Sequence, residues 1–264
     1  ARNAPSTEAP LYKAKVIDKV QSEKAALWTG QLCARWSVRV IPFVNIETIP
    51  SIETDPDPAI WVCNHSSMLD IFMLLACDKK LRGNKKRPIK IVYWKQLEDN
   101  LVTKLLYRQC GFIPVNMADN GNGNDNEYDM SSFRSLLKDT KQALEDGFDI
   151  GILPEGQPNP NPEAGLLPIF SGAYTLARMS KRPIHMMAMH GVHKLWHPEN
   201  GMECTGRNVK IRCYPHGRKY ASGDEFIEVF TKVVGHFGQT GEDIEDVQGW
   251  LDGTKWQEQM QESA

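Results

Sequence analysis

A histidine and an aspartate five residues apart, in Asn64-His65-Ser66-Ser67-Met68-Leu69-Asp70, are the side chains in this sequence best suited to chemistry. A carboxylate bonded to one ring nitrogen of a histidine fixes the tautomer and leaves the other nitrogen free to accept a proton. A hydroxyl activated in this way attacks an electrophile such as a thioester carbonyl. General base catalysis of this kind contributes on the order of 10²–10⁴-fold to the rate.

The spacing of His65 and Asp70 restricts where the two side chains can meet. On one continuous helix, five residues turn through about 500°, which leaves the side chains roughly 140° apart. They can meet if His65 lies in a strand-to-helix turn and the helix begins near Ser67. Ser67 is a good N-cap, and Asp70 three residues later suits a capping box. A simpler interpretation stays open, in which Asp70 only caps a helix and His65 only fills a turn.

A second candidate is the carboxylate of Glu155, in Ile152-Leu153-Pro154-Glu155-Gly156. A buried strand is predicted to end here, and ligands of α/β proteins bind at the carboxyl ends of the strands. In the functional interpretation, Glu155 accepts a hydrogen bond from a substrate hydroxyl. In the alternative, Pro154 and Gly156 only bend a surface turn.

The elements that would position these residues alternate from about residue 59 to residue 237. Short apolar runs predict buried strands, and helical spacing of apolar residues predicts the helices between them. Strands are expected at 59–63, 89–93, 112–115, 148–153, 183–189 and 209–213, and helices at 68–77, 96–107, 132–146, 171–179 and 225–237. The alternation predicts one α/β domain with an N-terminal helical appendage.

The predicted domain covers residues 11–240, with a tail at each end. Residues 1–10 are polar and Pro-rich and are expected to be disordered, and residues 241–264, rich in Gln and Glu, are expected to form a weakly ordered tail. The near-helical spacing of apolar residues within 11–44 predicts one or two helices. These either pack on the domain or lie at a membrane interface as a basic, Trp-bearing amphipathic segment.

Composition excludes some classes of function. The 264 residues carry a formal net charge of −2, which gives no global attraction to nucleic acid. No stretch approaches the roughly 18 to 20 apolar residues that span a bilayer, so we expect peripheral membrane contact at most. Six cysteines without a C-x-x-C pair are expected to be reduced thiols of an intracellular protein. The polar start suits the remainder of a cleaved transit peptide, so an organelle such as a plastid is one option.

Two further patterns resemble ligand sites without matching one. The histidines at 185, 190, 193 and 197, with Cys204 and Cys213 nearby, have no spacing of a closed zinc site, so we expect no metal. The loop at 119–126 matches neither a dinucleotide-binding nor an EF-hand pattern and is expected to be a mobile surface loop.

The motifs together resemble those of the glycerolipid acyltransferase family, which includes lysophosphatidate acyltransferases. The first motif of that family is N-H-x-x-x-x-D and the third reads F-P-E-G-T-R-S. Lys95-Gln96-Leu97 resembles a lysine-bearing segment after the second strand, Gly111-Phe112-Ile113-Pro114-Val115 the second motif, and Pro183-Ile184 the start of the fourth. The resemblance covers residues 59 to 237. It implies a mixed, mostly parallel sheet flanked by helices, an active site at the strand ends and N-terminal helices touching the membrane.

The resemblance also implies roles for single residues. It makes His65 the base, Asp70 its partner and Glu155 a residue of the acceptor site. We further assign Asn64, Lys95 and Gly156 to substrate binding.

The implied reaction moves a fatty acyl group from a thioester, acyl-CoA or acyl carrier protein (acyl-ACP), to a hydroxyl of a glycerolipid or other lipid alcohol. It needs no metal or organic cofactor. Direct transfer is favoured because no Ser or Cys lies in a nucleophile elbow, although Ser66 and Ser67 keep an acyl-enzyme open. The alternative is a non-catalytic structural or lipid-binding subunit, which would act within a protein complex.

The sequence departs from the family at two arginines that are thought to hold the phosphate of the acceptor. Asn116-Met117 ends the second motif, and Gln157-Pro158-Asn159 continues the third. A phosphomonoester requires charge-assisted, often bidentate donors. Either other cations replace the arginines, with Lys95, Arg178 and Arg182 as candidates, or the acceptor is not lysophosphatidate.

Overall fold

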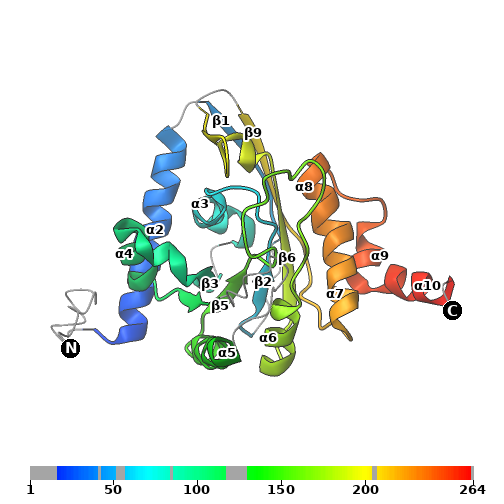
Figure 1. Cartoon of the computed structure of the whole chain (residues 1–264), viewed down its shortest axis with the longest axis horizontal. Helices are drawn as coiled ribbons and strands as arrows, with labels where there is room; N and C mark the ends of the chain where they lie inside the picture. Colours follow the sequence, from blue (N-terminus) through cyan, green and yellow to red (C-terminus); the bar gives the residue numbers. More distant parts are fainter. Residues whose placement is uncertain are drawn as a thin grey trace.

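The computed structural model describes residues 17–40, 43–51, 57–83, 86–116, 130–203 and 207–262. Its strands are β1 (Val44–Ile49), β2 (Ile60–Val62), β3 (Ile89–Trp94), β4 (Ile113–Val115), β5 (Asp149–Ile152), β6 (Ile184–His190), β7 (Trp196–His197), β8 (Gly201–Met202) and β9 (Arg207–Cys213). Within the described residues, seven strands form a sheet of order β1-β9-β6-β2-β5-β3-β4 (Figure 1). Neighbouring strands are parallel except β6 and β9, which are antiparallel. The predicted mixed, mostly parallel sheet is confirmed.

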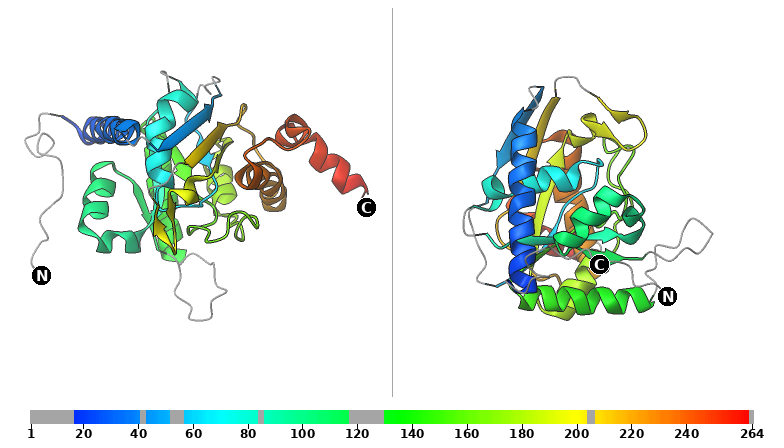
Figure 2. Two further views of the ribbon diagram at one scale, coloured as in Figure 1. Left: turned by 90° about the horizontal axis from the view of Figure 1, so that it is seen from above. Right: turned by 90° about the vertical axis from the view of Figure 1, so that its left-hand side faces the viewer.

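Helices cover both faces of this sheet. They are α2 (Lys19–Val40), α3 (Asp70–Arg82), α4 (Leu101–Gln109), α5 (Met130–Glu145), α6 (Gly172–Ser180), α7 (Gly223–Phe230), α8 (His236–Thr240), α9 (Val247–Asp252) and α10 (Thr254–Glu262), with a short 3₁₀ turn η1 (Lys95–Asp99). Figures 1 and 2 place α2, α3 and α4 on one side of the sheet and α7 and α8 on the other. Because both faces are covered, every residue of β2 and β5 is buried, as is usual for central parallel strands.

The N-terminal segment differs from the prediction. The helix α2 ends at Val40, and residues 44–49, expected to lie at the end of a helix and beyond it, form the edge strand β1 parallel to β9. Apolar and polar residues alternate in Val44-Asn45-Ile46-Glu47, which is a strand signal. No helix in the described part of the chain combines the length and the apolar character needed to cross a membrane.

The predicted apolar helix at 225–237 is present, and it continues from α7 into α8 through one π-type turn at Thr231–Gly235. Its stripe of Phe226, Phe230 and Phe237 is completely buried. The stripe packs α7 and α8 against the sheet and belongs to the apolar core.

A buried ionic network joins α2 and α3 to the sheet. Lys90 Nζ lies 2.6 Å from Glu23 Oε2 of α2, and Arg82 of α3 contacts Asp78 and Asp149, each at 2.6 Å. Buried charges persist only when they are paired, so these contacts restrict how the elements can sit. They fix α3, which begins at Asp70, against β5, which leads to Glu155.

Part of the segment predicted to be a C-terminal tail is helical in the structure. Within residues 241–264, expected to be a weakly ordered tail, α9 and α10 are helical. The Asp246 side chain accepts the N–H of Gly249, and Leu251 is buried, so a cap and a core contact hold α9. The expected tail at 1–10 and the loop at 119–126 lie outside the described residues, and the division into one domain and two tails stays a prediction.

Candidate functional site

The candidate site lies in the turn between β2 and α3. His65 Nδ1 is 2.9 Å from Asp70 Oδ2, so the contact expected from the sequence is present. The helix begins at Asp70 itself, later than the predicted start near Ser67. The Ser67 hydroxyl accepts the N–H of Leu69 and donates to the carbonyl of Trp196, which ties the turn to β7 in place of capping α3.

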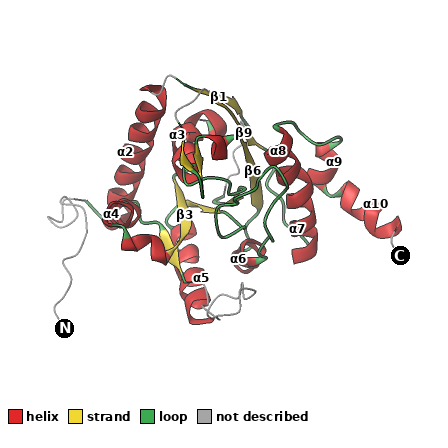
Figure 3. Cartoon of the chain, turned by 45° about the horizontal axis from the view of Figure 1, so that its top comes forward, coloured by secondary structure: helices red, strands yellow, loops and turns green. Residues whose placement is uncertain are grey.

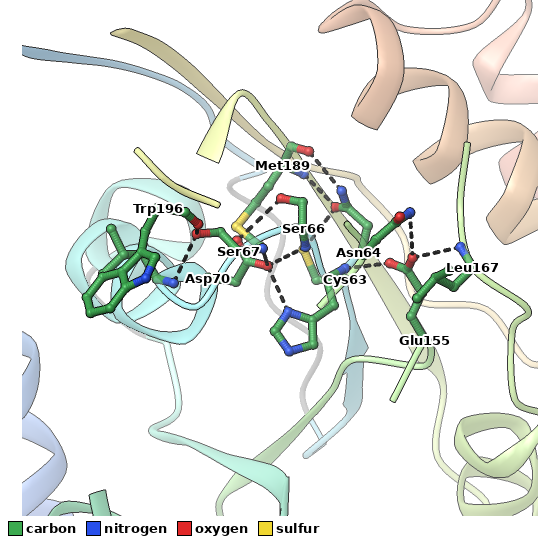
Figure 4. A network of polar contacts seen from close by, with 12 residues as sticks. Cys63, Asn64, Ser66, Ser67, Asp70, Glu155, Leu167, Met189 and Trp196 are labelled. Carbon is green, nitrogen blue, oxygen red and sulfur yellow. Dashed lines mark hydrogen bonds and ion pairs between the residues drawn. The ribbon is translucent and has the colours of Figure 1, made fainter. Parts of the chain in front are cut away.

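Asp70 is completely buried at the first position of α3. Besides the histidine ring, its Oδ2 accepts the N–H of Ser66 at 2.5 Å and the N–H of Ser67 at 2.8 Å (Figure 4). Three donors and the amino end of a helix all stabilise a negative charge at this place. Asp70 therefore closes the turn as a cap would and also orients the imidazole, so the two interpretations of the sequence describe one arrangement.

The His65 ring is accessible from one side, with its side chain 16% exposed. With Nδ1–H donating to Asp70, the lone pair of Nε2 is free, and the described residues provide no hydrogen-bond partner for Nε2. An imidazole held in this tautomer is suited to take a proton from a hydroxyl that approaches Nε2.

Glu155 follows the carboxyl end of β5, as the sequence predicted, and its side chain is buried. It is 2% exposed, its Oε1 accepts the backbone N–H of His65 at 2.6 Å, and its Oε2 accepts the N–H of Leu167 at 2.9 Å. Burial raises the pKa of Glu155, while these two N–H donors oppose that rise. Each carboxylate oxygen accepts a hydrogen bond from the protein, so in this structure Glu155 supports the backbone of His65, and its contact with an acceptor hydroxyl stays a prediction.

Asn159 completes the support of His65 and was not identified from the sequence. Its backbone N–H donates to the carbonyl of His65 at 2.8 Å, and its side chain reaches Glu155 Oε2 at 3.3 Å and the carbonyl of Gly165 at 2.7 Å. The loop after β5 thus holds the histidine backbone by both its N–H and its carbonyl. The only sequence signal was the departure from the third motif at 157–159.

Asn64 and Gly156, for which substrate binding stays a prediction, both shape the backbone in this structure. Asn64 is 2% exposed, and its amide pairs with both the N–H and the carbonyl of Met189, at 2.8 and 2.9 Å (Figure 4). This pair fastens the turn after β2 to the end of β6. Gly156 has a φ of +73°, a left-handed conformation in which a side chain is disfavoured, so the turn after Glu155 requires glycine.

The three candidate cations separate into two places. Lys95 is exposed at the start of η1, directly after β3, and lies at the same strand-end edge as His65 because β2, β5 and β3 are parallel. Arg178 and Arg182 precede β6, whose first residue Ile184 pairs with the first residue of β2. They lie at the amino ends of the parallel strands, whereas His65 lies at the carboxyl ends. The prediction that Arg178 and Arg182 replace the missing motif arginines is therefore wrong.

The four histidines considered for zinc lie in different environments. His185 stacks on Trp61 at 4.3 Å between ring centroids, and His193 faces Glu163. His190 donates to the carbonyl of Gly238, and His197 donates to that of Pro160. Over the described ranges, no group of three or more His, Cys, Asp and Glu side chains is arranged to hold a metal ion.

The fold and this geometry define an α/β protein with a His–Asp pair at the carboxyl ends of parallel strands. The family model described as Acyltransferase matches residues 40–190, more than half of the 264 residues. The chain belongs to this acyltransferase family.

Curated relatives and a solved structure agree with this assignment. LPAT1 of Arabidopsis thaliana, named a chloroplastic 1-acyl-sn-glycerol-3-phosphate acyltransferase, is 24% identical over 190 residues, covering 69% of this chain and 47% of that protein. A 1-acyl-sn-glycerol-3-phosphate acyltransferase of Cocos nucifera is 22% identical over 200 residues, covering 75% and 56%. The chain spans about half the length of the curated relatives that it matches.

The crystal structure of the 1-acyl-sn-glycerophosphate acyltransferase PlsC from Thermotoga maritima matches with a TM-score of 0.62 and 16% identity. The match covers 86% of this chain and 84% of that one. This likeness shows a shared fold.

Proposed function

We propose that this protein transfers a fatty acyl group from an acyl thioester, acyl-CoA or acyl-ACP, to a hydroxyl of a glycerolipid or other lipid alcohol. The observation that carries the proposal is the 2.9 Å contact between His65 Nδ1 and Asp70 Oδ2, which leaves Nε2 of a partly exposed ring available as a base. Membership of the acyltransferase family and the names of the curated relatives support it.

In the proposed mechanism, His65 Nε2 takes the proton of the acceptor hydroxyl as the hydroxyl oxygen attacks the thioester carbonyl. Asp70 stabilises the imidazolium that forms. The tetrahedral intermediate then expels the thiolate, which takes the proton from Nε2, so an ester and a free thiol result. The carboxyl group arrives already activated as the thioester, so the mechanism needs no metal or organic cofactor.

Direct transfer is favoured over an acyl-enzyme because the two neighbouring serines are poor nucleophiles here. Ser66 and Ser67 are both buried. The Ser67 hydroxyl already donates to the carbonyl of Trp196 at 2.7 Å, and neither serine hydroxyl is bonded to the ring of His65. A hydroxyl without a base at its proton is not activated for attack.

The acceptor proposal follows from the cations at the strand-end edge. The second and third motifs lack their arginines, and Lys95 is the candidate cation that remains at this edge. One lysine is a point charge and does not replace two guanidinium forks on a phosphomonoester. We therefore favour a lysophospholipid with a head group, a neutral glyceride or another lipid alcohol over lysophosphatidate.

Peripheral membrane contact is part of the proposal. Trp28, Trp36 and Val40 of α2 are exposed, as are Leu101 and Leu106 of α4. Figure 3 shows α2 and α4 as neighbours on one side of the molecule, so these apolar side chains and nearby cations such as Arg39 suit a lipid interface. Two curated relatives are named chloroplastic, which supports a plastid as the compartment.

Purified protein, incubated with labelled acyl-CoA or acyl-ACP and a panel of lysophosphatidate, lysophosphatidylcholine, monoacylglycerol and a long-chain alcohol, tests the function. We expect an acylated product with at least one acceptor, and the rates rank both donors and acceptors. Absence of transfer to every acceptor, together with saturable lipid binding, would support the non-catalytic alternative, which the missing motif arginines favour.

Substituting Glu155 tests whether it positions His65. In Glu155→Gln, an amide NH₂ must face the N–H of either His65 or Leu167, and leaving a buried donor unpaired costs about 1–3 kcal/mol. We expect the free energy of unfolding in urea to fall by about that amount. We expect kcat to fall by roughly ten- to a hundredfold with KM nearly constant, which marks lost transition-state stabilisation.

Glu163→Gln is the matched control, because Glu163 is an exposed glutamate of the same loop region. It should leave kcat and the unfolding free energy near those of the wild type. A large rise in KM for the acceptor with unchanged kcat in Glu155→Gln would instead restore the predicted contact between Glu155 and substrate.

A further inference from the structure

A groove lined by positive charge lies at the amino ends of the parallel strands, between α6 and the segment after β9. Its volume is about 290 Å³. Five of its lining residues are cations and none of the described residues that line it is a carboxylate; the cations are Arg178, Lys181, Arg182, Arg218 and Lys219. We call this feature the basic groove.

Three of these charges are not neutralised. Arg218 pairs with the buried Glu225, and Arg182 lies 3.5 Å from Asp57, whose side chain is 71% exposed. The side chains of Arg178, Lys181 and Lys219 are exposed and form no ion pair or hydrogen bond with any described residue. The basic groove therefore carries an excess of about three positive charges, more than a single carboxylate would balance.

The carboxyl end of α6 does not use these side chains as caps. Its last carbonyls are satisfied by backbone, because Lys181 N–H donates to the carbonyl of Arg178 at 3.2 Å and Arg182 N–H to that of Ala177 at 3.0 Å. Lys181 also has a φ of +58°, at a position where glycine is the usual residue. The chain thus places a cation where helix termination alone favours glycine.

We propose that the basic groove binds the phosphate groups of an anionic ligand, as a phosphomonoester or an oligophosphate. Guanidinium groups match phosphate oxygens with paired donors, and ammonium groups add point charges. A concave surface of one charge sign also concentrates its counter-ion, because its low-dielectric wall focuses the field. A ligand with two or three negative charges matches the excess in the groove.

The groove is separate from the proposed catalytic site. Ile184 in its lining pairs with Ile60 at the start of β2, whereas His65 follows the end of that strand. Figure 1 shows α6 at the lower end of β6, the end where this strand begins. A phosphate in the groove does not contact the thioester or the acceptor hydroxyl, so this site does not depend on the proposed function.

Titration calorimetry with inorganic phosphate, pyrophosphate and ADP tests the proposal. We expect saturable binding of at least one of them to the wild-type protein at one site. Affinity should fall at least tenfold in the triple variant Arg178→Gln/Lys181→Gln/Lys219→Gln, which changes only exposed side chains and should keep its melting temperature and acyl transfer rate.

The matched control is Arg134→Gln/Lys138→Gln/Lys141→Gln, because these three residues make the same change of charge on an exposed face of α5. It should bind the same anions as the wild type does.

Vesicles of phosphatidylcholine with and without phosphatidate form a second experiment. Binding to phosphatidate vesicles that the first triple variant alone loses would assign the phosphate to a lipid head group, and binding of the soluble anions would assign it to a free ligand. Absence of saturable binding in both the calorimetry and the vesicle experiment would overturn the proposal. An equal loss of affinity in both triple variants would overturn it as well.

Discussion

Replacing His65 with alanine is expected to lower kcat for acyl transfer by at least 10²–10⁴-fold, the contribution of a positioned general base. The ring is the group that can take the proton of the acceptor hydroxyl, since Nε2 is available and Nδ1 is bonded to Asp70. The fold should persist, because Glu155 and Asn159 contact the His65 backbone and not its ring. Single-turnover kinetics with labelled acyl thioester would measure the loss, and circular dichroism would report the fold.

His236→Ala is a suitable control, because His236 lies on α8, on the other side of the sheet from α3. Its kcat should equal that of the wild type. Turnover by His65→Ala at the wild-type rate would remove His65 from the mechanism, even if the protein proves to be an acyltransferase.

Replacing Asp70 with asparagine is expected to lower kcat by about 10²–10⁴-fold while the turn stays intact, because a neutral amide no longer stabilises the imidazolium. The amide oxygen can still accept the N–H groups of Ser66 and Ser67. Asp70→Ala should lose activity and also stability, because it leaves those buried donors unpaired at about 1–3 kcal/mol each. Steady-state kinetics and urea unfolding of both variants would separate the two effects.

This pair of variants also decides between the two interpretations of the motif. If Asp70→Asn keeps wild-type turnover and only Asp70→Ala is impaired, Asp70 is a cap without a catalytic role. Wild-type stability of Asp70→Ala would contradict the hydrogen bonds described for its carboxylate.

The contact between His65 and Asp70 could be predicted because it is local. Both residues lie within one seven-residue segment, and the geometry of a turn followed by a helix determines whether they meet. The contact between Glu155 and the backbone of His65 could not be predicted in the same way. Its partner is a backbone N–H ninety residues earlier, and that contact exists only because β2 and β5 are adjacent in a particular register.

The prediction that Arg178 and Arg182 replace the missing motif arginines failed because of the topology of the sheet. They lie between the third and fourth motifs in sequence. However, the connection from β5 to β6 is a crossover between parallel strands, so its last residues return to the amino ends of the strands. The edge strand β1 carries a local signal in the alternation from Val44 to Glu47, but its pairing with β9, far along the chain, is not local.

The helix α2 is attached to the rest of the protein at two points along its axis. Glu23 holds Lys90 of the sheet, and two turns further on, about 12 Å along the axis, Gln31 holds Asp78 of α3 at 2.7 Å. One attachment would leave a pivot about which the helix could swing, whereas two remove that freedom. A lipid surface that Trp28 and Trp36 contact would therefore lie at one fixed angle to the strand ends that carry His65.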